Sequence, residues 1–168
     1  MWGTLLILPV RYINWTDTRK QEIMWFRLWA LLGFFAMAGG FVALFMDGNL
    51  LSLNPAIVAI QTAAVALVVS ARRYLGLRSF HAGAKPTRGA LVTDGPYRVI
   101  RHPIYTGACL FVWPPAVSCH TLPAFTLTAL VTVGAVIRML CEERVLAKHY
   151  PEYRGYARAT KRMIPYVV

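Results

Sequence analysis

Charged and aromatic residues lead directly into an apolar segment in the stretch Asp94-Gly95-Pro96-Tyr97-Arg98-Val99-Ile100-Arg101-His102-Pro103-Ile104-Tyr105-Thr106-Gly107. The apolar segment that starts there continues to Cys119, and a second one from Leu122 ends in Cys141-Glu142-Glu143-Arg144. These two segments predict a helical hairpin that carries ionisable groups at one of its ends. Ionisable groups beside hydrocarbon are costly and usually functional, so this end of the hairpin is the first candidate site.

The composition indicates a membrane protein. Of 168 residues, 57% are hydrophobic and only 15% are charged, which is too apolar for an ordinary soluble domain. Four apolar runs, at about residues 23–46, 55–71, 103–119 and 122–141, are long enough to cross about 30 Å of hydrocarbon as helices. We therefore predict an all-α integral membrane protein with about four transmembrane helices and a C-terminal cytoplasmic helical segment. The single domain, 1–168, would comprise an interfacial segment at 1–22, a helical hairpin at 23–75 and a core at 76–168.

The basic residues predict the orientation. All 18 lie before or just inside the first run, between the second and third runs, or from the end of the fourth run onward. The turns at 47–54 and 120–121 contain none. Since cytoplasmic loops are rich in Lys and Arg, both termini and the long central loop are expected in the cytoplasm. Anionic lipid headgroups then explain the net charge of +11, and no motif for nucleic acid accompanies it.

Several further residues have ordinary structural explanations. The glycines of the first run, Gly33, Gly39 and Gly40, either allow close helix packing or are simply common in membrane helices. Gln61 is expected to form an interhelical hydrogen bond. Trp113-Pro114-Pro115 predicts a kink or an early end of the third helix. The cysteines have no metal-ligand or disulfide spacing, so we expect no metal site, and no obligate protein partner is evident.

The start of the third run has the properties of an anion site. If Pro103 is its first helical residue, backbone N–H groups of residues 103–106 other than proline's own point outward with the positive end of the helix dipole. Arg101 and His102 would add charge or donors, and Gly107 would leave the first turn open. The pattern favours an anionic or zwitterionic ligand.

The acidic pair of the fourth run has two possible roles. Arg138 and Glu142 are four residues apart and share a helix face, so one acid can pair with Arg138. The other acid is then available for a ligand ammonium, ribose hydroxyls or Arg101. Alternatively, both acids simply meet basic residues at the membrane surface. Three tyrosines that follow at a spacing of three either pack or form the walls for an adenine or a prenyl chain: Tyr150, Tyr153 and Tyr156.

These motifs resemble the isoprenylcysteine carboxyl methyltransferase family, in the broad sense that includes small prokaryotic members and the related phospholipid methyltransferases. The resemblance covers the C-terminal half, in the segments 91–98, 101–107, 142–146, 150–156 and 164–165. RHPxYxG followed by EExxL at this separation is a specific pairing. It implies an integral-membrane enzyme whose residues 76–168 bind S-adenosylmethionine in a cytoplasm-facing pocket, with a hydrophobic acceptor that enters from the bilayer.

The resemblance also implies roles for individual residues. The cofactor would be bound by Leu91, Val92, Thr93, Gly95, Tyr97, His102, Pro103, Tyr105, Gly107, Glu142 and Glu143. Catalytic roles would belong to Arg101, Glu143 and Arg158, and the acceptor would contact Tyr153, Tyr156 and Arg162. A carboxylate acceptor, such as that of isoprenylcysteine, needs no base, whereas an amine or thiol would need Glu143, His102 or a tyrosine.

One departure from the family pattern affects the acceptor. Family members commonly carry a further arginine where this chain has Ala159-Thr160, with basic residues displaced to Arg158, Lys161 and Arg162. An isoprenylcysteine carboxylate is therefore only one candidate acceptor. Sterol reductases resemble the same helical core but use NADPH, and the Glu142-Glu143 pair fits the methyltransferases better. The third possibility is a non-enzymatic membrane scaffold or accessory protein.

Overall fold

The chain folds into helices joined by short connections. The computed structural model describes residues 15–76 and 91–164, with side chains from residue 24 onward in the first range. The long helices are α1 (Trp15–Met46), α2 (Pro55–Leu75), α3 (Pro103–Cys119) and α4 (Leu122–His149). A short 3-10 helix, η2 (Gly95–Arg98), precedes α3, and α5 (Tyr153–Ala159) follows α4. Residues 1–14 of the predicted interfacial segment at 1–22 lie outside the described residues, as does the loop at 77–90, and residues 15–22 of that segment form the start of α1.

The helix ends follow local chemistry. Asn54 caps α2, because its side chain accepts a hydrogen bond from the Ala56 N–H, and Thr121 caps α4 in the same way. Proline occupies the first turn of α2, α3 and α4, where its missing N–H has no consequence. Pro151 follows directly after Tyr150, the residue that caps the end of α4. Of the two alternatives predicted at Trp113-Pro114-Pro115, the early end is wrong, because α3 continues through Pro114 and Pro115 to Cys119, and the kink stays a prediction.

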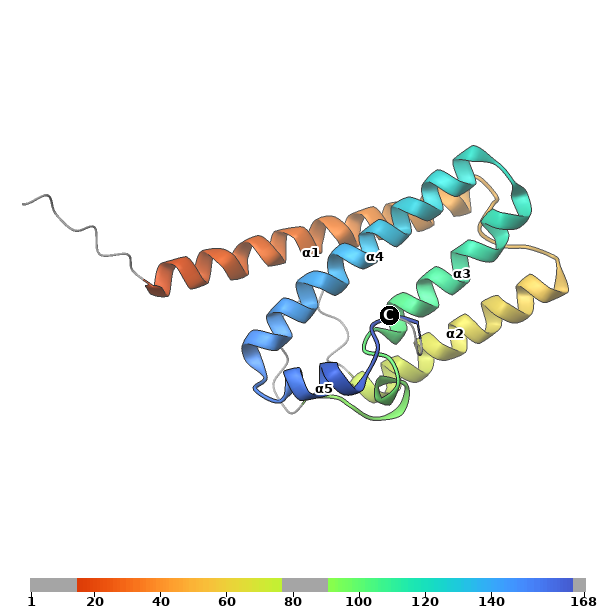
Figure 1. Cartoon of the computed structure of the whole chain (residues 1–168). Helices are drawn as coiled ribbons and strands as arrows, with labels where there is room; N and C mark the ends of the chain where they lie inside the picture. Colours follow the sequence, from red (N-terminus) through yellow and green to blue (C-terminus); the bar gives the residue numbers. More distant parts are fainter. Residues whose placement is uncertain (1–14, 77–90, 165–168) are drawn as a thin grey trace, which may run out of the picture.

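The helices form a layered bundle with its functional residues at one end. In Figure 1, α1 runs antiparallel along α4, and α2 lies beside α3. Helix α3 also packs on α4, so that α4 joins the two pairs. The C-terminal ends of α2 and α4, the N-terminal end of α3 and the whole of α5 gather at the same end of the bundle (Figure 1).

Two close backbone contacts hold α1 against α4. A Cβ atom at Gly134 would lie 2.6 Å from the carbonyl oxygen of Gly33, and one at Gly40 would lie 2.6 Å from the side chain of Val131. Only glycine allows this approach, so small residues set the helix separation as they often do in membranes. Gly39 faces open space, so the predicted packing role holds for two of the three glycines.

The α2 and α3 pair carries the expected polar contact. The Gln61 Nε2 donates to the carbonyl of Leu50 at 2.8 Å and to that of Phe111 at 3.1 Å. This confirms the predicted interhelical hydrogen bond.

The fold class is confirmed as all-helical and membrane-spanning. Three helices in the described part of the chain are long and apolar enough to cross a bilayer: Met24–Met46 of α1, α2 and α4. Their outward faces carry large apolar side chains, among them Phe35 and Leu122. At 17 residues, α3 is at the lower limit of a span, so the fourth crossing stays a prediction.

Candidate functional site

The site begins where the chain before α3 meets the chain after α5. The Arg101 N–H donates to the carbonyl of Lys161 at 2.7 Å, and the His102 N–H donates to that of Arg162 at 3.0 Å. In return, the Lys161 N–H donates to Val99, which completes a short parallel pairing. The Thr106 hydroxyl donates to the carbonyl of Met163 at 2.8 Å. Residues 160–163 are therefore held along the start of α3.

Arg101 connects three parts of the site. Its Nε donates to Glu143 Oε1 at 3.0 Å, and its Nη1 donates to the carbonyl of Ala157 at 2.8 Å and to that of Thr160. Those carbonyls lie at the C-terminal end of α5, where a cation is favourable. Of the partners left open for the second acid, Arg101 is the one that the structure provides. Thr160 is one of the two residues at which this chain departs from the family pattern, and its carbonyl accepts a hydrogen bond from the Arg101 guanidinium.

Glu143 lies between two arginines. In addition to Arg101, the Arg162 Nε donates to Glu143 Oε2 at 3.1 Å. The Glu143 side chain is 13% exposed, whereas that of Arg162 is 43% exposed. Arg162 therefore supplies a second positive charge at the outer edge of the site, close to the missing family arginine in sequence.

A second polar cluster lies deeper in the bundle. The Arg138 Nη2 donates to Glu142 Oε1 at 3.1 Å, as the spacing predicted, and its Nε donates to the Tyr105 hydroxyl at 2.8 Å. The Tyr105 hydroxyl in turn donates to Glu142 Oε1 at 2.5 Å. Arg138 and Tyr105 are both buried, so each charge and hydroxyl here depends on the others.

His102 lies between the two clusters. Its Nδ1 is 3.9 Å from Glu142 Oε2, and its Nε2 is 3.5 Å from Glu143 Oε1. The ring stacks near that of Tyr105, with 5.8 Å between centroids, and the residue is only 5% exposed. Although Glu143 is near, Nε2 makes no hydrogen bond within the described residues. A buried nitrogen in this state is suited to bind a ligand.

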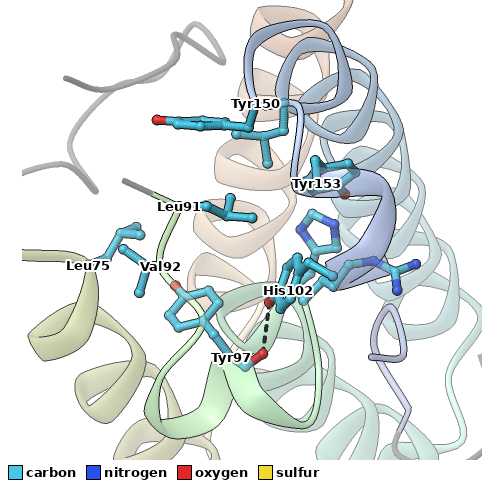
Figure 2. Close-up of a pocket in the computed structure, with 10 residues that line it drawn as sticks. Leu75, Leu91, Val92, Tyr97, His102, Tyr150 and Tyr153 are labelled. Atoms are coloured by element: carbon cyan, nitrogen blue, oxygen red, sulfur yellow. Dashed lines mark hydrogen bonds between the residues drawn. The ribbon is translucent and has the colours of Figure 1, made fainter. Parts of the chain in front are cut away.

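A cavity of about 90 Å³ opens beside His102. Figure 2 shows Leu75, Val92 and Tyr97 on one side, His102 and Tyr153 on the other, and Leu91 between them. The remaining lining residues are Arg101, Leu146, Tyr150 and Tyr156. The Tyr156 hydroxyl donates to the Tyr97 carbonyl at 2.8 Å, which joins α5 to η2 (Figure 2). The buried Tyr153 hydroxyl has no hydrogen-bond partner among the residues described.

Burial keeps three of the tyrosines around this cavity neutral. It raises the pKa of Tyr156 to about 12 and raises those of Tyr97 and Tyr153 well above their usual value. At neutral pH their hydroxyls are therefore hydrogen-bond donors and acceptors, and a tyrosinate base is disfavoured.

Ten of the predicted site residues lie in or beside the cavity. Seven of them line the cavity: Leu91, Val92, Tyr97, Arg101, His102, Tyr153 and Tyr156. Three others do not line the cavity but lie beside His102. The Tyr105 ring stacks near the His102 ring, and carboxylate oxygens of Glu142 and Glu143 lie within 4 Å of the His102 nitrogens. Sequence reasoning missed Leu75 and Leu146 as lining residues. The latter lies one helical turn after Glu142, so its spacing was a usable signal.

Other predicted residues have different surroundings. A Cβ atom at Gly107 would lie 2.5 Å from the Val68 side chain, so this glycine faces α2. One at Gly95 would meet the Tyr74 ring at 2.3 Å. Pro103 is the buried first residue of α3, and Thr93 is exposed. None of these four lines the cavity.

The surroundings of the α3 start and of Arg158 bear on two further expectations. The N–H groups of Tyr105 and Thr106 both donate to the carbonyl of His102, so the start of α3 offers an anion fewer donors than expected. Arg158 is exposed and forms no ion pair with a described residue, so it takes no part in the ion pairs of Glu143 with Arg101 and Arg162.

Known proteins resemble this chain over most of its length. It is 31% identical over 119 residues to the nickel-cobalt-cadmium resistance protein NccN of Alcaligenes xylosoxydans xylosoxydans, covering 67% of this chain and 52% of that protein. It is 32% identical over 116 residues to the cobalt-zinc-cadmium resistance protein CzcN of Cupriavidus metallidurans, covering 67% and 51%. The chain thus spans about half the length of these curated relatives. No solved structure matches it.

The family comparison covers the helices that build the cavity. The sequence model of phospholipid methyltransferases matches residues 53–153, from just before α2 to the start of α5. That range includes His102, Glu142 and Glu143. The chain belongs to the phospholipid methyltransferase family.

Proposed function

We propose that this protein transfers a methyl group from S-adenosylmethionine to a hydrophobic acceptor at the cytoplasmic face of a membrane. The observation that carries the proposal is the cavity itself. It combines apolar and aromatic walls with two lining residues whose buried polar atoms make no hydrogen bond to a described residue, His102 through Nε2 and Tyr153 through its hydroxyl. Convergent polar atoms in an apolar cavity are typical of ligand sites.

The residues present fit the proposed cofactor. Aromatic and aliphatic side chains, including Tyr97, Tyr150 and Leu91, suit the faces of an adenine ring. Arg101 Nη2 makes no hydrogen bond to a described residue and is available for the carboxylate of the methionine portion. When bound, the cofactor supplies the activated methyl group. Among the acids, Glu142 is the one whose Oε2 lies nearest to His102 Nδ1, at 3.9 Å.

The cavity must open to bind a cofactor of this size. Pockets for drug-sized ligands and cofactors are usually about 300–1,000 Å³, whereas the cavity here is about 90 Å³. The Tyr156 hydroxyl bond to Tyr97 is one contact that has to break for α5 to separate from η2. We therefore expect binding to be accompanied by a movement of α5.

The acceptor determines whether a base is needed. A carboxylate acceptor, as in isoprenylcysteine, requires only alignment with the methyl group and exclusion of water. An amine or thiol must lose a proton, and we favour His102 as the base, because its ring lines the cavity and its Nε2 makes no hydrogen bond to a described residue. The bilayer would deliver any hydrophobic acceptor to this end of the bundle.

The names of the relatives suggest a biological setting. We propose that methylation of a membrane-soluble acceptor by this protein contributes to resistance to cobalt, nickel or cadmium. Direct binding of these metals has no support in the described residues, where no three His, Cys, Asp or Glu side chains form a suitable group. Growth of cells with and without the gene, at increasing metal concentrations, tests this setting.

Calorimetry on the purified full chain tests the proposed activity. We expect S-adenosylmethionine to bind and NADPH, the cofactor of the sterol-reductase alternative, not to bind. The substitution His102→Asn should abolish or strongly weaken binding, because the cavity loses its imidazole. His120→Asn is the matched control, since His120 is exposed at the opposite end of α3, and asparagine tolerates its positive φ of 52°.

Transfer of a labelled methyl group into a membrane lipid extract tests the reaction. The wild-type chain and the His120→Asn control should label the same lipid-soluble product, and His102→Asn should not. If the wild-type chain binds no S-adenosylmethionine, the proposed function is wrong.

A further inference from the structure

The first helix lies outside the family match but reaches the site. The match starts at residue 53, whereas α1 ends at Met46. Nevertheless α1 packs along α4 and contacts the deeper polar cluster through Arg138. This raises the question of what α1 contributes to the chemistry beyond anchoring the chain.

Arg138 is held from the α1 side. Its Nη1 lies 3.4 Å from the carbonyl oxygen of Ala30, and its guanidinium lies over the Phe34 ring, 5.3 Å from the centroid. Arg138 is only 6% exposed and lies within the apolar part of α4. A charge in such a place is costly unless paired, and here a helix carbonyl and an aromatic face supply part of its environment.

The close helix contact makes this arrangement possible. A Cβ atom at Gly33 would lie 3.1 Å from Arg138 Cγ, so any larger residue there would crowd the arginine. The glycine therefore leaves room for the side chain between α1 and α4. Gly33 lies about one turn from Ala30 and next to Phe34, so the α1 residues that contact Arg138 all lie within residues 30–34.

Arg138 also contacts the residues beside the cavity. Its other two nitrogens donate to the Tyr105 hydroxyl and to Glu142 Oε1. Because Tyr105 donates to the same oxygen, Glu142 Oε1 is held twice, and Oε2 is left 3.9 Å from His102 Nδ1. The orientation of the Glu142 carboxylate thus depends on the position of the guanidinium.

We propose that Arg138 is a positioning residue through which α1 holds Glu142, and with it His102, in the geometry required at the cavity. The inference rests on the proposed function for its consequences in cofactor binding. Its structural content, however, concerns only residues of this chain and can be tested without cofactor.

Three variants of the full chain in detergent test the proposal. Arg138→Lys keeps the charge but cannot make three directed contacts. Phe34→Leu removes the aromatic face on α1. Phe45→Leu is the matched control, because it is the same substitution on the same helix at a ring that is 60% exposed.

The first measurement is made on the protein without cofactor. Nuclear magnetic resonance of isotope-labelled histidine reports the surroundings of His102, and His102→Asn assigns its signal. We expect the signal to shift in Arg138→Lys and Phe34→Leu and to stay unchanged in Phe45→Leu. An unchanged signal in the first two variants overturns the proposal, even if both proteins melt at a lower temperature.

The second measurement is the affinity for S-adenosylmethionine. We expect the Kd to rise about tenfold in Arg138→Lys, which corresponds to about 1.4 kcal/mol, and about two- to fivefold in Phe34→Leu. Wild-type affinity in both variants refutes the positioning role. If the wild-type chain does not bind the cofactor but the His102 signal shifts as expected, the proposed function fails and the role of Arg138 is retained.

Discussion

Replacing Arg101 by lysine should release residues 160–163 from the start of α3. Lysine can keep one ion pair with Glu143, but its single ammonium cannot also reach the carbonyls of Ala157 and Thr160, which the Arg101 Nη1 contacts. The Arg101 side chain is only 9% exposed, so both bonds are shielded from water. The substitution therefore tests whether this arginine holds the C-terminal segment in place.

The structure sets the size of the effect. Hydrogen bonds from a charged donor contribute about 1.5–3 kcal/mol each, and two are lost. Taking the lower value for each gives about 3 kcal/mol, which raises the opening equilibrium of the segment about 100-fold. The backbone bonds of Arg101 and His102 remain, so the segment should open more often without the whole protein unfolding.

Hydrogen exchange measured by mass spectrometry follows this opening. Peptides that contain Lys161 and peptides that contain Arg101 should both exchange about 100-fold faster, because their amides bond across the same pairing. Peptides from α2 serve as the internal reference. Arg98→Lys is the matched control, since Arg98 is exposed and only three residues away.

Two outcomes would contradict a holding role for Arg101. Unchanged exchange around Lys161 would show that the Arg101 side chain does not hold the segment. Equal acceleration in α2 would show that the substitution lowers global stability instead of releasing one segment.

Three further predictions concern packing and ionisation. Gly134→Ala should lower the free energy of unfolding by about 1–3 kcal/mol, because its Cβ would lie 2.6 Å from an α1 carbonyl. Gly39→Ala, in open space on a helix, should leave the thermal midpoint unchanged or raise it slightly, and equal midpoints for the two variants would contradict this packing. Gln61→Leu removes both hydrogen bonds from α2 to neighbouring carbonyls, so it should lower the free energy of unfolding by about 1 kcal/mol in a denaturation series. An unchanged free energy of unfolding would contradict this. Burial raises the pKa of Tyr156 to about 12, whereas a tyrosine in the unfolded chain has a pKa near 10. The unfolded chain therefore loses the Tyr156 hydroxyl proton at lower pH than the folded chain, and the free energy of unfolding should fall between about pH 10 and 12. Tyr156→Phe should show a shallower fall, and identical curves for the two proteins would disprove the contribution of Tyr156.

The helices could largely be predicted from local patterns. The apolar runs at residues 103–119 and 55–71 agree with α3 and most of α2, because the length of an apolar run is a local property of the chain. The start of α3 at Pro103 also follows from local chemistry. The continuation of α3 through Pro114 was not predictable in the same way, since packing against other helices can stabilise a helix that contains proline.

Part of the site could be predicted as well. The spacing of Arg138 and Glu142 correctly indicated their ion pair, because four residues bring side chains to one helix face. The leucines of the cavity wall were harder to recognise, because an apolar residue near a membrane surface has many ordinary roles. Gly107 was assigned to the ligand by resemblance, yet it faces α2, a direction that depends on the rotation of α3 within the bundle.

The apolar spans, the helix start at Pro103 and the concentration of charge at one end of the hairpin can be read from the sequence, since each depends on neighbouring residues. Which charges meet depends on the packing of the helices. Arg101 contacts Glu143 across 42 positions and the Thr160 carbonyl across 59, and Arg138 reaches Ala30 across 108. Such contacts depend on how α1 and α4 pack and on how the chain returns after α5. Pairwise spacing along the chain contains no information about either.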